Sequence, residues 1–97
     1  MTTNASESPN LPVSFSTLVL SLASSAILAM GLEKNPQTGA VEKDLDLARF
    51  NIDMLSMLKD KTKNNLTKDE QDFVENVISD LQIKFVYVSG GKKEPAQ

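Results

Sequence analysis

Residues 44–61 read DLDLARFNIDMLSMLKDK, and this segment decides the fold because its polar residues recur with the period of an α-helix. Spacings of three and four keep these residues on one narrow stripe of a helix: Asp46, Arg49, Asp53, Ser56 and Asp60. Asp44 is suited to cap the first turn. The sequence therefore predicts a helix over residues 44–61, with Arg49 spaced for ion pairs with Asp46 and Asp53.

The rest of this helix is unusually apolar. On a wheel of about 100° per residue, the polar stripe covers about 80° and an apolar arc, interrupted by Asn51 and Lys59, covers about 240°. A helix of a lone three-helix bundle buries a stripe of only about 100° or slightly more. Met54 and Met57 within the arc fit either pliable core filling or an adaptable binding surface. The excess apolar surface predicts a second partner for this helix.

A third helix is predicted after residue 66. Thr67 and Glu70 have the spacing of a capping box, in which each side chain satisfies a free backbone N–H of the other residue. Residues 83–88 have high strand propensity, but the helical period persists through them and favours helix. Gly90 and Gly91 end the pattern. The predicted buried stripe consists of Phe73, Val74, Val77, Ile78, Leu81, Phe85 and Val88, while Ile83, Val86 and Tyr87 fall off it.

The first helix is predicted over residues 15–30, with Ser14 as its N-cap and Gly31 as a left-handed C-cap. Residues 35–39 read NPQTG, a turn sequence that continues neither helix. The chain is therefore predicted to be all-α, a three-helix up-down bundle. The predicted boundaries are a disordered N-terminal arm at 1–12, a helical domain at 13–89 and a C-terminal tail at 90–97.

Composition narrows the function classes. The chain has 97 residues, a formal net charge of -3 and neither cysteine nor histidine. An acidic chain without a basic face is not expected to bind nucleic acid. Without His or Cys, the usual general base and the strongest nucleophile are missing, so we expect no enzyme, no catalytic residue, no cofactor and no metal site. The absence of cysteine is compatible with a cytoplasmic location, which we expect.

The first helix leaves an alternative open. No charged residue occurs between Ser8 and Leu32, and an uncharged run of this length could span a bilayer. The run contains several serines, and no Trp, Tyr, Lys or Arg anchors its ends. Membrane insertion is therefore the less favoured alternative to a soluble protein.

Three separated motifs resemble a bacterial family of unknown function, domain-of-unknown-function family 1844. They are FSTLVLSLA at residues 15–23, PQTG at 36–39 and IDMLSMLKDKTKNNLTKDE at 52–70. The resemblance covers about residues 13–88 and implies a fold but no activity. One departure is Asn at 64 and 65, where the family pattern implies Gly in the connection before the third helix. If the backbone there has positive φ, a side chain costs the turn a little, although Asn tolerates that conformation.

Chain size supports association. A domain this small buries only about 60–65% of the surface that its unfolded chain exposes, and it has no disulfide or zinc site to add stability. We therefore predict a homo-oligomer, with an unidentified protein partner as the other possibility. The predicted interface lies on the first helix and the outward flank of the second, at Leu18, Leu22, Leu47, Phe50, Met54 and Met57.

Overall fold

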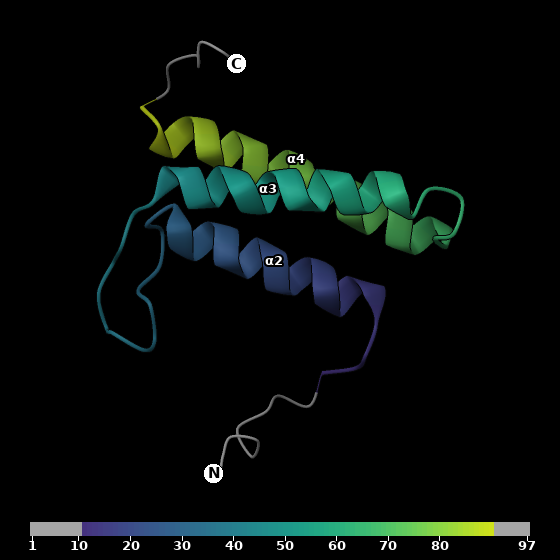
Figure 1. Ribbon diagram of the computed structural model, residues 1–97, viewed down its shortest axis with the longest axis horizontal. Helices are drawn as coiled ribbons and strands as arrows, with labels where there is room; N and C mark the ends of the chain where they lie inside the picture. The colour runs from purple at the N-terminus through teal and green to yellow at the C-terminus, as the bar shows by residue number, and fades with distance from the viewer. Residues whose placement is uncertain (1–10, 91–97) are drawn as a thin grey trace.

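The computed structural model describes residues 11–90, which form three α-helices and, within that range, no strand. Helix α2 spans Phe15–Ala29, α3 spans Leu45–Lys61 and α4 spans Lys68–Val88. Figure 1 shows successive helices running in opposite directions, and each helix contacts both others. The all-α, up-down prediction is confirmed. Most of the predicted N-terminal arm and all but the first residue of the predicted C-terminal tail lie outside the described residues.

The core lies between the three helices and is built from small and medium side chains. Alanines at three positions of α2 and at Ala48 of α3 let the backbones approach closely. The buried apolar residues are Val19, Ala23, Ala26, Ala29, Met30, Ala48, Ile52, Leu55, Val74, Ile78 and Leu81. The stripe predicted for the third helix is confirmed, because its members are either buried or packed against this core. The helix also continues through residues 83–88, as the persisting period predicted.

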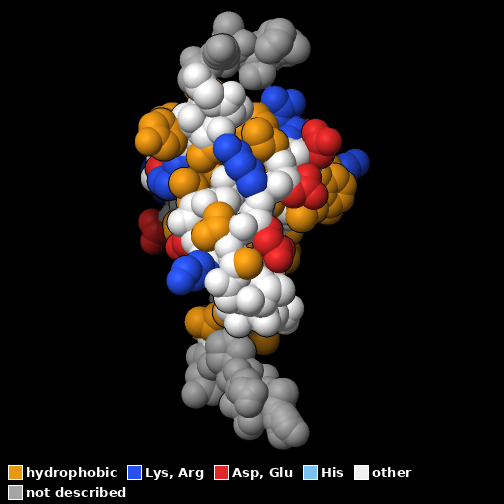
Figure 2. Space-filling view, turned by 90° about the vertical axis from the view of Figure 1, so that its left-hand side faces the viewer, with side chains coloured by type: hydrophobic (Ala, Val, Ile, Leu, Met, Phe, Trp, Pro, Cys, Tyr) orange, Lys and Arg blue, Asp and Glu red, His pale blue; other side chains and the backbone are white. Residues whose placement is uncertain are grey.

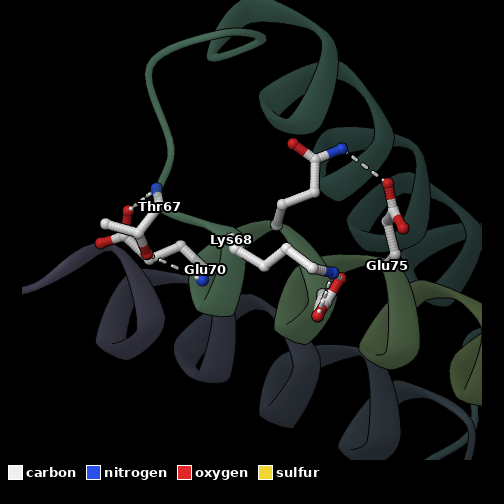
Figure 3. Close-up of polar contacts among 6 residues, drawn as sticks. Thr67, Lys68, Glu70 and Glu75 are labelled. Carbon is white, nitrogen blue, oxygen red and sulfur yellow. Dashed lines mark hydrogen bonds and ion pairs between the residues drawn. The ribbon is translucent and has the colours of Figure 1, made fainter.

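Each helix begins at the cap residue that the sequence predicted. The side-chain oxygens of Ser14, Asp44 and Thr67 each accept a hydrogen bond of 3.1 Å from the backbone N–H three residues later. At α4 the capping box is complete, because the N–H of Thr67 also donates to Glu70 Oε1 at 2.9 Å (Figure 3). Side-chain caps satisfy N–H groups that have no partner inside the helix, so these three starts are determined locally.

Helix α2 ends in a Schellman motif. The N–H of Leu32 donates to Ile27 O at 3.3 Å, and the N–H of Gly31 donates to Leu28 O at 3.0 Å. Gly31 has φ +80°, and a Cβ at this position would lie 3.3 Å from Lys43 Cβ. The backbone conformation therefore favours glycine here, and a side chain would also crowd Lys43.

The connection from α2 to α3 holds its own shape. The N–H groups of Gly39 and Thr38 donate to Asn35 O, and the N–H of Asn35 donates to Ala40 O at 2.8 Å. The N–H of Asp44 donates to Ala29 O at 2.7 Å, which ties the start of α3 to the end of α2. These bonds keep the two helices antiparallel and side by side.

The connection from α3 to α4 contains the one non-glycine residue between 11 and 90 with positive φ, Asn64 at 72°. It is the third residue of a turn closed by the N–H of Asn65, which donates to Thr62 O at 2.8 Å. Positive φ at this turn position is normally supplied by Gly or Asn. The family resemblance implied Gly at this place, and the geometry explains why.

The ion pairs predicted for Arg49 are wrong. Its guanidinium carbon lies 5.0 Å from the centroid of the Phe85 ring on α4, and the two ion pairs in the described part of the chain are Lys68–Asp72 and Lys84–Asp80. An ion pair with an exposed carboxylate stabilises Arg little in water, whereas the ring face provides both packing and a cation–π contact.

The hydrogen bond from Lys68 to Asp72, drawn in Figure 3, raises the pKa of Lys68 above its ordinary value, and the charge of Asp72 adds to this effect.

None of the three helices between residues 11 and 90 combines the length and apolar character needed to cross a bilayer.

Candidate interaction surface

Helix α3 leaves a row of apolar side chains outside the core. Leu47, Phe50 and Met57 are 47%, 56% and 42% exposed, and Met54 between them is partly buried. The buried residues of α3 occupy a different side of the helix: Ala48, Asn51, Ile52 and Leu55. The apolar arc predicted from the sequence is therefore only half covered by α2 and α4.

Helix α2 adds two predicted interface residues beside this row. Leu18 is 46% exposed, and Leu22 is partly buried against the core. Because α2 and α3 are antiparallel and joined where Asp44 donates to Ala29, equal rises along both helices place Leu22 and Leu18 about level with residues 51 and 55. Together, Leu18, Leu22, Leu47, Phe50, Met54 and Met57 are termed the α2/α3 face.

One end of the α2/α3 face adjoins a shallow hollow. Its lining comes from α2, from the connection and from α3: Ser25, Leu28, Ala29, Asn35, Glu42, Asp44 and Leu47. The presence of Ser25 and Leu47 in one hollow shows that the open sides of α2 and α3 are adjacent. The hollow opens to solvent and includes Leu47, so it continues the α2/α3 face.

Asn51 is the buried polar residue of the described core, with 6% of its surface exposed. Its Nδ2 donates to Leu47 O at 3.1 Å within the same helix, which provides a partner for a buried donor. Because Asn51 follows Leu47 by one helical turn, it lies at the border between the core and the α2/α3 face. Its amide hydrogen bond satisfies a buried donor within α3.

A second apolar group lies on the outer side of α4 and was not predicted as an interface. Ile83, Val86 and Tyr87 are 70%, 45% and 78% exposed, and we term them the α4 outer group. Their departure from the buried stripe was visible in the sequence. That signal locates exposed apolar residues, but it does not show whether they have a partner.

The end of the bundle near the C-terminus of α4 is mixed in character. Lys43 Nζ donates to Val88 O at 3.0 Å, which ties the α2–α3 connection to the last turn of α4. Figure 2 views this end, where hydrophobic side chains lie in several places between Lys or Arg and Asp or Glu side chains. An open hollow at this end is lined mainly by apolar residues of α4, the end of α2 and the connection: Met30, Gly31, Leu32, Val41, Lys43, Tyr87, Val88 and Gly90.

The carboxylates of the described residues are spread along the helices and connections. Within residues 11–90, no three His, Cys, Asp or Glu side chains gather closely enough to hold a metal ion. Asp46, Asp53 and Asp60 are exposed, and their seven-residue spacing separates neighbours by about 10 Å along the helix. Such a row marks an edge of the α2/α3 face rather than a centre of chemistry.

Comparison with known proteins identifies the family. The family model described as domain of unknown function (DUF1844) matches residues 12–87. The chain belongs to this family. No curated protein and no solved structure matches the chain. The DUF1844 match confirms the resemblance drawn from the three motifs and includes every residue of the α2/α3 face.

Proposed function

We propose that this DUF1844 chain is a helical protein-interaction module that self-associates through the α2/α3 face. The observation that carries the proposal is the row of apolar side chains left exposed on α3, where Leu47, Phe50 and Met57 are 47%, 56% and 42% exposed. A monomeric helix of this kind normally presents polar residues at such positions. Covering the row with a second protein surface removes this apolar area from water.

The energetics favour association for a chain of this size. An interface of standard size removes about 800 Å² from each partner. At about 25 cal/mol per Å² of its apolar part, the gross gain is on the order of 10 kcal/mol before association costs. This gain is comparable to the whole stability of a small domain, about 5–15 kcal/mol. Self-association therefore supplies stability that the sequence, without cysteine or histidine, does not obtain from disulfides or zinc.

The proposal includes no catalytic role and places the protein in the cytoplasm. The absence of a catalytic role is inferred from residue chemistry, because the chain has no His or Cys and its carboxylates are dispersed along exposed helix surfaces. The cytoplasmic location is inferred from composition, because the chain carries no cysteine to pair in an oxidising compartment.

Sedimentation velocity tests the proposal directly. The wild-type protein is expected to sediment as a dimer or larger species at micromolar concentration. Phe50→Glu places a charge in the centre of the face and is expected to give a monomer with unchanged helical content by circular dichroism. Ile83→Glu, which adds the same charge at a position 70% exposed on α4, is the matched control. A wild-type protein that stays monomeric at all accessible concentrations contradicts the proposal.

A further inference from the structure

The exposed row on α3 has the spacing of a coiled-coil seam. Leu47, Phe50, Met54 and Met57 are separated by three, four and three residues. This is the a-d-a-d pattern that lets one helix pack lengthwise along another. A second helix lying along α3 therefore covers the whole row, whereas a helix crossing it steeply covers only part of it.

The two edges of this seam differ in charge. One edge carries Asp46, Asp53 and Asp60, which are seven residues apart, exposed, and absent from both ion pairs of the described part of the chain. On the other edge, at the same seven-residue spacing, lie the exposed Asp44, the buried Asn51 and the partly buried Leu58. The seam thus has one edge with three carboxylates outside any ion pair and one edge with a single carboxylate, Asp44, at its start.

Helix α2 lies beside this second edge. It has no charged residue between Phe15 and Ala29, and its exposed side toward the seam carries Ser21 and Ser25. The hollow shared by Ser25 and Leu47 shows that this side borders the seam. A helix that approaches the seam therefore meets the row of three aspartates on one side. On the other side it meets the serine hydroxyls of α2, with Glu42 and Asp44 at the end where the hollow lies.

The orientation of a second copy follows from this asymmetry. In an antiparallel pair of α3 helices, like edges meet, so that Asp53 faces its own equivalent and Asp46 faces Asp60 of the other copy. Like charges placed opposite each other across an interface disfavour that arrangement. In a parallel pair, each edge of three aspartates meets the edge of the other copy on which Asp44 is the single carboxylate.

We propose that two copies pair with their α3 helices parallel, about a twofold axis along the helices, and that the acidic edge of each meets the serine edge of the other's α2. This inference rests on the proposed self-association. Equal rises from the Ala29–Asp44 contact place Ser25 and Ser21 about level with residues 48 and 52 of α3. In unstaggered parallel pairing, these hydroxyls lie within about 3 Å along the axis of Asp46 and Asp53. The carboxylates accept hydrogen bonds from the hydroxyls.

Disulfide trapping tests the orientation, because the chain has no cysteine of its own. In parallel pairing, position 47 faces 47 and position 57 faces 57. Leu47→Cys and Met57→Cys are then each expected to form disulfide-linked dimers when incubated alone with a mild oxidant. In antiparallel pairing, position 47 faces position 57, and identical positions lie about 15 Å apart along the axis. A disulfide requires Cα atoms within about 7 Å, so only a mixture of the two variants would then cross-link.

The outcomes separate this inference from the proposed function. Efficient cross-linking of each single variant, above the background of Ile83→Cys on α4, supports parallel pairing. Cross-linking only in the mixture overturns parallel pairing while self-association stands. A lack of any cross-link above background overturns parallel pairing, and a monomeric mass for the wild-type protein then overturns self-association as well.

The contact between the aspartates of α3 and the serines of the other copy's α2 can be tested separately, by measuring the strength of the dimer. Asp53→Asn removes one charge at an exposed position and keeps the shape of the side chain. It is expected to weaken the dimer by about threefold to tenfold, because a hydrogen bond to a charged acceptor is stronger than one to a neutral amide. An unchanged or tighter dimer, measured by sedimentation equilibrium, overturns the acidic–serine contact.

Discussion

Truncation of Phe50 to alanine gives a quantitative test of a twofold interface. Phe50 is 56% exposed in the isolated chain, and a phenylalanine buries about 200 Å² when fully covered. Complete burial in a dimer therefore removes about 110 Å² more, worth about 2.8 kcal/mol at 25 cal/mol per Å². The alanine side chain keeps part of that area, which leaves a loss of about 2 kcal/mol per copy.

Symmetry doubles this loss. A twofold dimer contains Phe50 twice, so the dissociation free energy is expected to fall by about 4 kcal/mol, which raises Kd about a thousandfold. Sedimentation equilibrium over a wide concentration range measures the change. The unfolding free energy of the monomer, measured by urea denaturation at low concentration, is expected to change by less than about 0.5 kcal/mol, because the ring is already largely exposed.

The control is Ile83→Ala, since Ile83 is 70% exposed and lies on α4 outside the α2/α3 face. It is expected to leave Kd within about threefold of the wild-type value, an effect below 1 kcal/mol. If Phe50→Ala changes Kd by less than tenfold, or if Ile83→Ala weakens the dimer equally, the placement of the interface on α3 is refuted.

Three further substitutions test the fold by urea denaturation. Asn64 has φ 72°, so Asn64→Ala is expected to cost about 1 kcal/mol whereas Asn64→Gly costs nothing or stabilises; equal losses would contradict a strained turn. Thr67→Ala removes the side-chain half of the capping box and is expected to cost about 1 kcal/mol, and an unchanged midpoint would show that the cap contributes nothing. Leu55→Ala at a fully buried site is expected to cost about 3 kcal/mol, and a loss below 1 kcal/mol would place Leu55 outside the core.

Local signals in the sequence determined the helices and their starts. Ser14, Asp44 and Thr67 cap helices as predicted because a cap depends on a side chain and a backbone N–H only three residues apart. The period of three and four residues similarly determined which residues of α4 face inward. The glycine that the family resemblance implies near residue 64 fits the positive φ of Asn64.

The tertiary structure decided which part of the apolar arc of α3 is covered. Leu55 is fully buried while Phe50 is 56% exposed. The sequence placed Phe50 on the outward flank, but how much of each side chain is covered depends on where α2 and α4 pack. The partner of Arg49 was decided in the same way. The sequence suggested neighbouring aspartates, but Phe85 lies 36 positions along the chain and reaches Arg49 only through the packing of α4 against α3. Caps and periodicity are local interactions that one helix contains, whereas coverage of a face requires a second helix at a defined position.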